Sequence, residues 1–358
     1  MHRFYPSFAT FLACTYAALI AYASLYPFSG WQTSGLPLFD FLGAPWPRDR
    51  RPDDLISNIL GYIPLGFLVT MALRHHTRRW AAALLAVLLT TSLSFSVEFL
   101  QNLLPSRVAS NVDLGSNALG GLIGALIGVY TTPHLLGQRG HLHRLRRAHV
   151  VPGRAGELGL ILVALWLIAQ AQPLEAPFNG GMLGEHFDWT SPLAFSATAF
   201  MRIEAFTVAC SCLATGFFVM TLVHHRPLLA TWTVVACGLL IKSGASWLFL
   251  VPGDALGWAT PGSLAGIAIS LVLLSLASWL PPRSWRPLAV AFLILMVAGS
   301  NLLPVTPYDV FGPSLARRGN GINFLGMANG LALLWPALAL AFLASLRWSN
   351  GYRARRAV

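Results

Sequence analysis

The chain has 358 residues, of which 55% are hydrophobic and only 10% are charged, and its mean hydropathy is +0.62. A soluble domain carries about 25% charged residues, so this composition excludes an ordinary soluble protein and indicates a polytopic membrane protein. The net charge of +11 comes from 24 lysines and arginines against 13 acidic residues.

Apolar runs of roughly the length needed to cross a bilayer occur ten times, at residues 8–26, 55–73, 80–104, 114–131, 157–172, 204–223, 228–250, 262–280, 287–303 and 321–346. They predict an all-α fold, a bundle of about ten transmembrane helices. The first run ends in Ala21-Tyr22-Ala23, which resembles a signal-peptidase site. It is long for a signal segment, and we expect it to remain a membrane helix.

The distribution of arginines predicts the topology. With a cytoplasmic amino terminus, 16 arginines fall in cytoplasmic loops and tails and seven fall outside. The positive-inside rule then places both termini in the cytoplasm, and we expect a multi-pass protein of the bacterial cytoplasmic (inner) membrane. Topology accounts for the basic surplus, so no nucleic-acid partner is expected. Most acidic residues fall at the external side.

Polar side chains gather at the predicted external ends of three helices. Ionisable groups at the centre of a membrane helix cost at least ~2.5 kcal/mol each, so they normally face a partner, a bundle interior or water. Residues three or four positions apart share a helix face, which aligns the polar side chains of each helix. We therefore predict a single site, the predicted site below, that consists of Asp54, Asn58, Glu98, Gln101, Arg107, Asp113 and Asn117.

Two further features concern helix packing. Gly120, Gly124 and Gly128 recur at four-residue spacing, a pattern that lets another helix approach closely. Lys242 lies inside the seventh apolar run, where an ammonium group needs a partner. We expect it to pair with Glu204 or Glu98.

A shift of 150 residues relates the first half of the chain to the second. Pro27-Phe28 falls on Pro177-Phe178, and Asp54 falls on Glu204. We predict a parallel repeat of four, four and two helices, which differs from the inverted repeats of many transporters. The predicted parts are a four-helix unit (1–135), a basic cytoplasmic linker (136–156), a degenerate second four-helix unit (157–282), and two final helices with a basic tail (283–358).

Residues of about 20–131 resemble the VanZ-like family of bacterial membrane proteins, whose namesake is a teicoplanin-resistance accessory protein. The resemblance rests on the ordered residues Asn58, Pro64-Leu65-Gly66, Glu98, Gln101, Pro105, Arg107, Asp113, Asn117 and Gly120. A degenerate second copy follows residue 157. The resemblance implies an integral cell-envelope protein and a link to glycopeptide (teicoplanin) resistance, and it implies no particular reaction.

Three interpretations of the predicted site remain open. In the first, it binds the head group of a membrane lipid or a lipid-linked envelope precursor, because Arg107 suits a phosphate or carboxylate. In the second, it is catalytic, with Glu98 as general acid or base and Asp113 as its counterpart; carboxylates of this kind also hold hard divalent cations. In the third, it is a purely structural polar network. We favour binding without catalysis, and we expect no cofactor and no metal. The oligomeric state is open.

Overall fold

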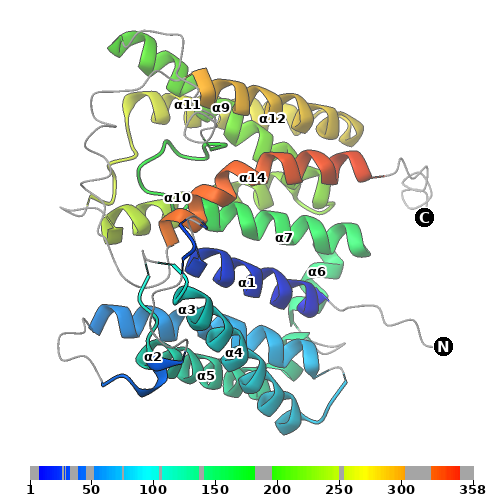
Figure 1. Ribbon diagram of the computed structural model, residues 1–358. Helices are drawn as coiled ribbons and strands as arrows, with labels where there is room; N and C mark the ends of the chain where they lie inside the picture. The colour runs from blue at the N-terminus through cyan, green and yellow to red at the C-terminus, as the bar shows by residue number, and fades with distance from the viewer. Residues whose placement is uncertain are drawn as a thin grey trace. The chain divides into compact units, whose positions relative to one another are not determined.

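The computed structural model describes residues 8–25, 28, 30–32, 39–45, 52–74, 76–104, 107–136, 141–181, 196–249, 254–302 and 324–346. Within these residues the regular elements are helices (Figure 1), and an isolated bridge between Val150 and Val223 is the sole β-type pairing. The predicted all-α fold class is therefore confirmed.

Each predicted apolar run coincides with a helix. The bounds are α1 (Phe8–Leu25), α3 (Pro52–Leu73), α4 (Arg79–Gln101), α5 (Asn111–Leu136), α7 (Arg154–Ala169), α9 (Ala197–Leu222), α10 (Pro227–Phe249), α11 (Pro261–Ala277), α12 (Trp285–Leu302) and α14 (Phe324–Ser345). The largest difference is at α9, which begins at Ala197 rather than at residue 204. The polar residues Arg202 and Thr198 there belong to the helix and do not precede it.

Six helical segments of the described chain are long and apolar enough to cross a membrane: Arg79–Gln101, Asn111–Thr131, Ala197–Leu222, Pro227–Leu248, Pro282–Leu302 and Ala328–Ser345. Shorter apolar helical segments cover Ala9–Leu25, Asn58–Leu73 and Pro261–Ala277. The other helices are α7 and the short α2 (Asp40–Gly43) and α6 (His141–His149), and the 3₁₀ turn η1 (Pro282–Ser284) begins the segment that contains α12. Of these, α6 lies in the predicted linker.

The chain divides into two compact units. Unit 1 comprises residues 1–146 and 318–327, and unit 2 comprises residues 147–317 and 328–358. The predicted boundaries of the four parts, and the predicted internal repeat, stay predictions.

Unit 1 is built around α3, which packs against α1, α4 and α5. Small residues of α4 and α5 form one part of its core, namely Ala83, Ala86, Ala125 and Val129. Another part joins α1 to α3 through Ile20, Tyr62 and Leu65. This packing brings the carboxyl-terminal ends of α1 and α4 to the amino-terminal ends of α3 and α5.

Unit 2 is built around α9, which packs against α7, α10, α11 and α12. All side chains from Thr207 to Met220 are buried, on every face of the helix. A helix that is apolar all round is stable only when neighbours surround it. The sequence of α9 therefore makes it the central helix of this unit.

Candidate functional site

Glycines bring α3 and α5 into backbone contact. A Cβ atom added at Gly124 would lie 2.0 Å from the carbonyl oxygen of Ile63, and one added at Gly120 would lie 2.4 Å from that of Ile59. At Gly66, on α3, the added atom would lie 2.1 Å from the carbonyl oxygen of Gly121. The predicted role of the four-residue glycine spacing is confirmed, and the close approach aligns the polar faces of the two helices.

The amino-terminal end of α5 is organised by Ser110 and Glu98. The backbone N–H of Ser110 donates to Glu98 Oε2 at 2.8 Å, and the Ser110 hydroxyl accepts the N–H groups of Val112 and Asp113 at 3.2 and 3.5 Å. Serine in this position is a favoured N-cap, and Glu98 accepts the N–H of this cap residue. Glu98 itself is 3% exposed. A carboxylate from α4 is thus fixed against the positive end of another helix.

A hydrogen bond between Asn58 and Asp113 joins α3 to the amino-terminal end of α5. Asn58 Nδ2 donates to Asp113 Oδ1 at 2.9 Å. Asn58 is buried and Asp113 is half-buried. The two residues lie 55 positions apart in the sequence, and their contact depends on the close packing of α3 against α5.

Two donors of the predicted site satisfy carbonyl groups at the end of α1. Gln101 Nε2 donates to the carbonyl of Ser24 at 3.0 Å, and the Arg107 guanidinium donates to that of Ala23 at 3.5 Å. The last carbonyls of a helix have no partner within that helix, so these contacts fix α1 to the loop after α4. Partial burial lowers the pKa of Arg107 from its ordinary value, because removal from water disfavours the charged form.

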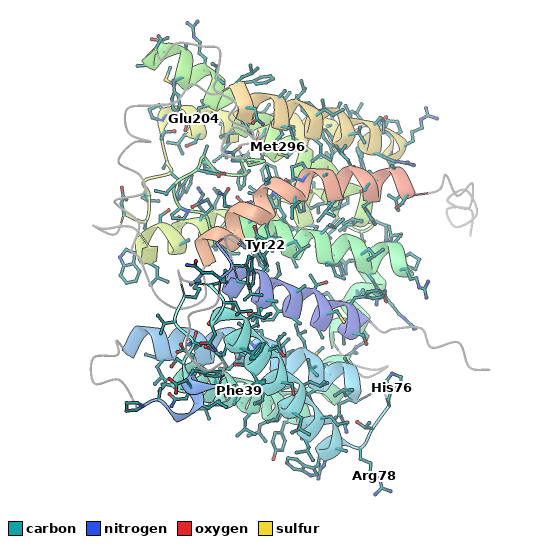
Figure 2. All side chains as sticks on the ribbon, viewed as in Figure 1. Tyr22, Phe39, His76, Arg78, Glu204 and Met296 are labelled. Atoms are coloured by element: carbon teal, nitrogen blue, oxygen red, sulfur yellow. The ribbon has the colours of Figure 1, made fainter. Side chains whose placement is uncertain are left out.

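The short helix α2 covers the outer part of α4. Phe39, labelled in Figure 2, stacks on Phe95 with ring centroids 6.4 Å apart and lies 5.7 Å from Phe99. Asn111 Nδ2 donates to the carbonyl of Ala44 at 2.7 Å. Phe39 is nevertheless 57% exposed. An aromatic, partly exposed surface therefore lies beside the polar residues.

A second, deeper layer lies one turn further into the bundle. Asn117 Nδ2 donates to Ser94 Oγ at 2.9 Å, and Tyr62 lies beside Ser94 and within electrostatic range of Glu98. These side chains are fully buried. We call Tyr62, Ser94 and Asn117 the inner layer.

The structure brings six of the seven predicted residues to one end of unit 1: Asn58, Glu98, Gln101, Arg107, Asp113 and Asn117. Asp54 lies in the first turns of α3, and its side chain is outside the described residues. Sequence reasoning missed Tyr62, Ser94 and Ser110. The helical spacing of four from Asn58 to Tyr62 and from Ser94 to Glu98, and the capping pattern from Ser110 to Asp113, were the available signals.

This arrangement offers oxygen acceptors in the interior and a cationic donor at the rim. Among the described residues, no three histidine, cysteine, aspartate or glutamate side chains lie close enough together to hold a metal ion. The Glu98 carboxylate accepts a hydrogen bond from the backbone N–H of Ser110, which fixes its position as an acceptor.

In unit 2, the prediction for Lys242 was wrong. Its Nζ donates to the backbone carbonyl of Gln172 at 2.6 Å, and its charge faces Glu175 rather than Glu204 or Glu98. The segment after α7 folds back to supply both groups, which helix periodicity does not reveal. Glu204, labelled in Figure 2, instead accepts a hydrogen bond from the Thr260 hydroxyl at 2.7 Å, at the N-cap of α11.

The chain was also compared with known proteins. Residues 7–132 match the family model described as VanZ/LLP1. This range contains the resemblance predicted over about 20–131 and extends it to include most of α1. No curated protein and no solved structure matches the chain.

Proposed function

We propose that the membrane unit containing residues 7–132, the range that matches the VanZ/LLP1 family model, binds the head group of a membrane lipid or a lipid-linked envelope precursor. The residues of the predicted site form its binding groups. The observation that carries the proposal is the position of Arg107: a half-buried guanidinium at the helix ends of an apolar bundle, beside the buried Glu98 region. A lipid has the matching chemistry, with an apolar tail for the bundle surface and a polar head for the site.

Arg107 supplies recognition of an anionic group. A guanidinium presents a planar set of donors that matches the oxygens of a phosphate or carboxylate. Partial removal from water strengthens its electrostatic interactions. The neighbouring residues Gln101 and Asp113 are also partly exposed. The rim of the site therefore carries both a donor for phosphate and acceptors for hydroxyl or amino groups.

Binding is favoured over the catalytic alternative by the hydrogen bonds of the carboxylates. Glu98 accepts from Ser110 and Asp113 accepts from Asn58. A general acid or base has to lie within hydrogen-bond reach of the proton that it exchanges with the substrate. The two carboxylates of this site serve first as fixed acceptors.

The test is native mass spectrometry of the protein extracted with its lipids. We expect Arg107→Ala to reduce the retained lipid by roughly ten- to hundredfold, because a charge-assisted hydrogen bond contributes about 1.5–3 kcal/mol. The matched control is Arg78→Ala, an exposed arginine at the opposite end of α4 in the same unit. Equal retention by wild type and Arg107→Ala, or an equal loss in both variants, would contradict the proposal.

The proposed role in the cell envelope requires a particular membrane and a particular orientation of the protein in it. We place the protein in the cytoplasmic (inner) membrane with both termini cytoplasmic, supported by the 16-to-7 distribution of arginines. The site then faces outward, where lipid-linked wall precursors are exposed to glycopeptides. In a teicoplanin-sensitive bacterial host, we expect expression of the wild-type chain to raise the minimum inhibitory concentration at least twofold and Arg107→Ala to abolish that rise. An equal rise in the minimum inhibitory concentration with wild type and Arg107→Ala would mean that resistance does not depend on the predicted site.

A further inference from the structure

Two buried polar atoms of the inner layer have no hydrogen-bond partner among the described residues. They are the Tyr62 hydroxyl and Asn117 Oδ1, in side chains that are 1% and 5% exposed. Ser94 lies beside Tyr62, but the two hydroxyls do not form a hydrogen bond of acceptable geometry. Ser94 Oγ accepts a hydrogen bond from Asn117 Nδ2, the other polar atom of that amide. The two atoms, one on α3 and one on α5, therefore both lie near Ser94 on α4.

Of the seven buried side-chain atoms that have no partner among the described residues, these two share one neighbour, Ser94. Leaving a buried donor or acceptor without a partner costs about 1–3 kcal/mol. The neighbouring Asn58, Asp113 and Ser110 all form hydrogen bonds. An arrangement with two such atoms together is therefore better explained by a bound group than by structural support.

The polar face ends just below the inner layer. One turn further along α4, the Thr90 hydroxyl bonds to the carbonyl of Val87 in its own helix, and an added Cβ at Gly121 would lie 2.3 Å from it. Beyond that level Ala86 and Ala125 are fully buried, and the next buried polar side chain, Thr70, lies against Gly128. A bound group that enters from the Arg107 end would therefore reach Tyr62 and Asn117 last.

We infer that Tyr62 and Asn117 form the inner end of the head-group site and receive a hydrogen-bond donor from the ligand. This inference rests on the proposed function and adds the ligand class. Asn117 Oδ1 is an acceptor only, and the nearby Glu98 is also an acceptor. Arg107 at the rim is a donor suited to phosphate. The ligand is thus a phosphate-bearing lipid whose head continues into a hydroxyl or ammonium group, rather than one that ends in a group without N–H or O–H.

Two zwitterionic phospholipids test this directly. Phosphatidylethanolamine and phosphatidylcholine share the phosphate, but only the first has N–H donors. We expect the wild-type protein, reconstituted in bilayers with equal amounts of both and examined by native mass spectrometry, to retain phosphatidylethanolamine about tenfold over phosphatidylcholine. Tyr62→Phe removes one hydroxyl and keeps the ring. It should reduce this preference several-fold while the total retention that depends on Arg107 persists.

Tyr16→Phe is the matched control. Tyr16 is another tyrosine in the interior of unit 1, but its hydroxyl already donates to the carbonyl of Gly61 at 3.0 Å. Its loss should leave the lipid preference unchanged, even where it lowers thermal stability. An equal loss of preference in both variants would overturn the inference.

The remaining outcomes separate the inference from the proposed function. Retention that requires Arg107 but shows no preference between the two lipids would overturn the inference and keep the proposed function. No retained lipid at all would overturn both. A Tyr62→Phe protein with unchanged preference but lower unfolding temperature would mean that the two atoms hold a permanent structural water, and this also overturns the inference.

Discussion

Replacing Gly124 by alanine is expected to separate α3 from α5 and to lower the free energy of unfolding by about 3 kcal/mol or more, at the upper end of overpacking effects. The added Cβ would lie 2.0 Å from the carbonyl oxygen of Ile63 and 2.8 Å from the backbone nitrogen of Phe67. Both contacts are with backbone, so no side-chain rotation relieves them. The two helices must move apart. The measurement is thermal unfolding of the purified protein in detergent.

Gly115→Ala is the control for that experiment. Gly115 lies on the same helix, α5, and an added Cβ there meets no atom within 4 Å. Alanine is favoured over glycine within a helix by about 1 kcal/mol, so this variant should be neutral or slightly more stable. If Gly124→Ala unfolds at the same temperature as Gly115→Ala, the packing of α3 against α5 does not depend on the missing side chain.

The separation of α3 from α5 would also affect the site. The hydrogen bond from Asn58 to Asp113 joins these two helices, and Asn117 extends from α5 toward Ser94 on α4. We therefore expect Gly124→Ala to lose retained lipid together with stability. Loss of both properties in one variant is the signature of a damaged scaffold, which differs from the selective loss expected for Arg107→Ala.

Glu98→Ala is expected to lower the free energy of unfolding by about 3 kcal/mol, whereas Glu98→Gln should lower it by only about 1 kcal/mol. Alanine leaves the backbone N–H of Ser110, which now donates to Glu98 Oε2 at 2.8 Å, without its acceptor in a buried position. A buried donor without a partner and the vacated volume both cost free energy. Glutamine retains a carbonyl oxygen that accepts from Ser110. Chemical or thermal unfolding in detergent measures the difference.

Ser96→Ala provides the baseline for the Glu98 variants. Ser96 lies on α4, is exposed, and bonds only to the carbonyl of Ser92 in its own helix. Its replacement should change the free energy of unfolding by no more than about 0.5 kcal/mol. If Glu98→Ala is as stable as Ser96→Ala, the carboxylate does not hold the end of α5. If Glu98→Gln is as unstable as Glu98→Ala, the negative charge matters more than the acceptor.

The helices of this protein were predictable because each apolar run has to be long enough to match the thickness of the hydrocarbon layer. The same reasoning located the ends of α1, α3, α4 and α10 within a few residues. It failed at the start of α9, where Arg202 lies in the first turns of the helix. Hydropathy marks the membrane-embedded part of a helix and does not mark turns that continue beyond it.

The gathering of the predicted site was also predictable, because polar side chains at the ends of neighbouring membrane helices have few other places to lie. The partners of each side chain were not. Glu98 accepts a hydrogen bond from the backbone N–H of Ser110, and Asp113 accepts one from Asn58. Spacing along one helix does not predict either contact. Lys242 contacts Gln172 and Glu175, which lie on an irregular segment. Such a segment has no helical periodicity from which the contact could be predicted.

Composition, the apolar runs and the ordered polar residues of 54–117 thus predicted an all-helical membrane protein whose first part resembles the VanZ-like family, and residues 7–132 match the VanZ/LLP1 family model. These properties depend on local chemistry, namely the length of an apolar run and the spacing of residues on one helix face. Which buried atoms are paired, and which are not, depends on how closely α3, α4 and α5 approach one another. The glycine contacts set that distance. The Tyr62 hydroxyl and Asn117 Oδ1 have no partner among the described residues, because hydrogen bonding across helices requires placement to within a few tenths of an ångström.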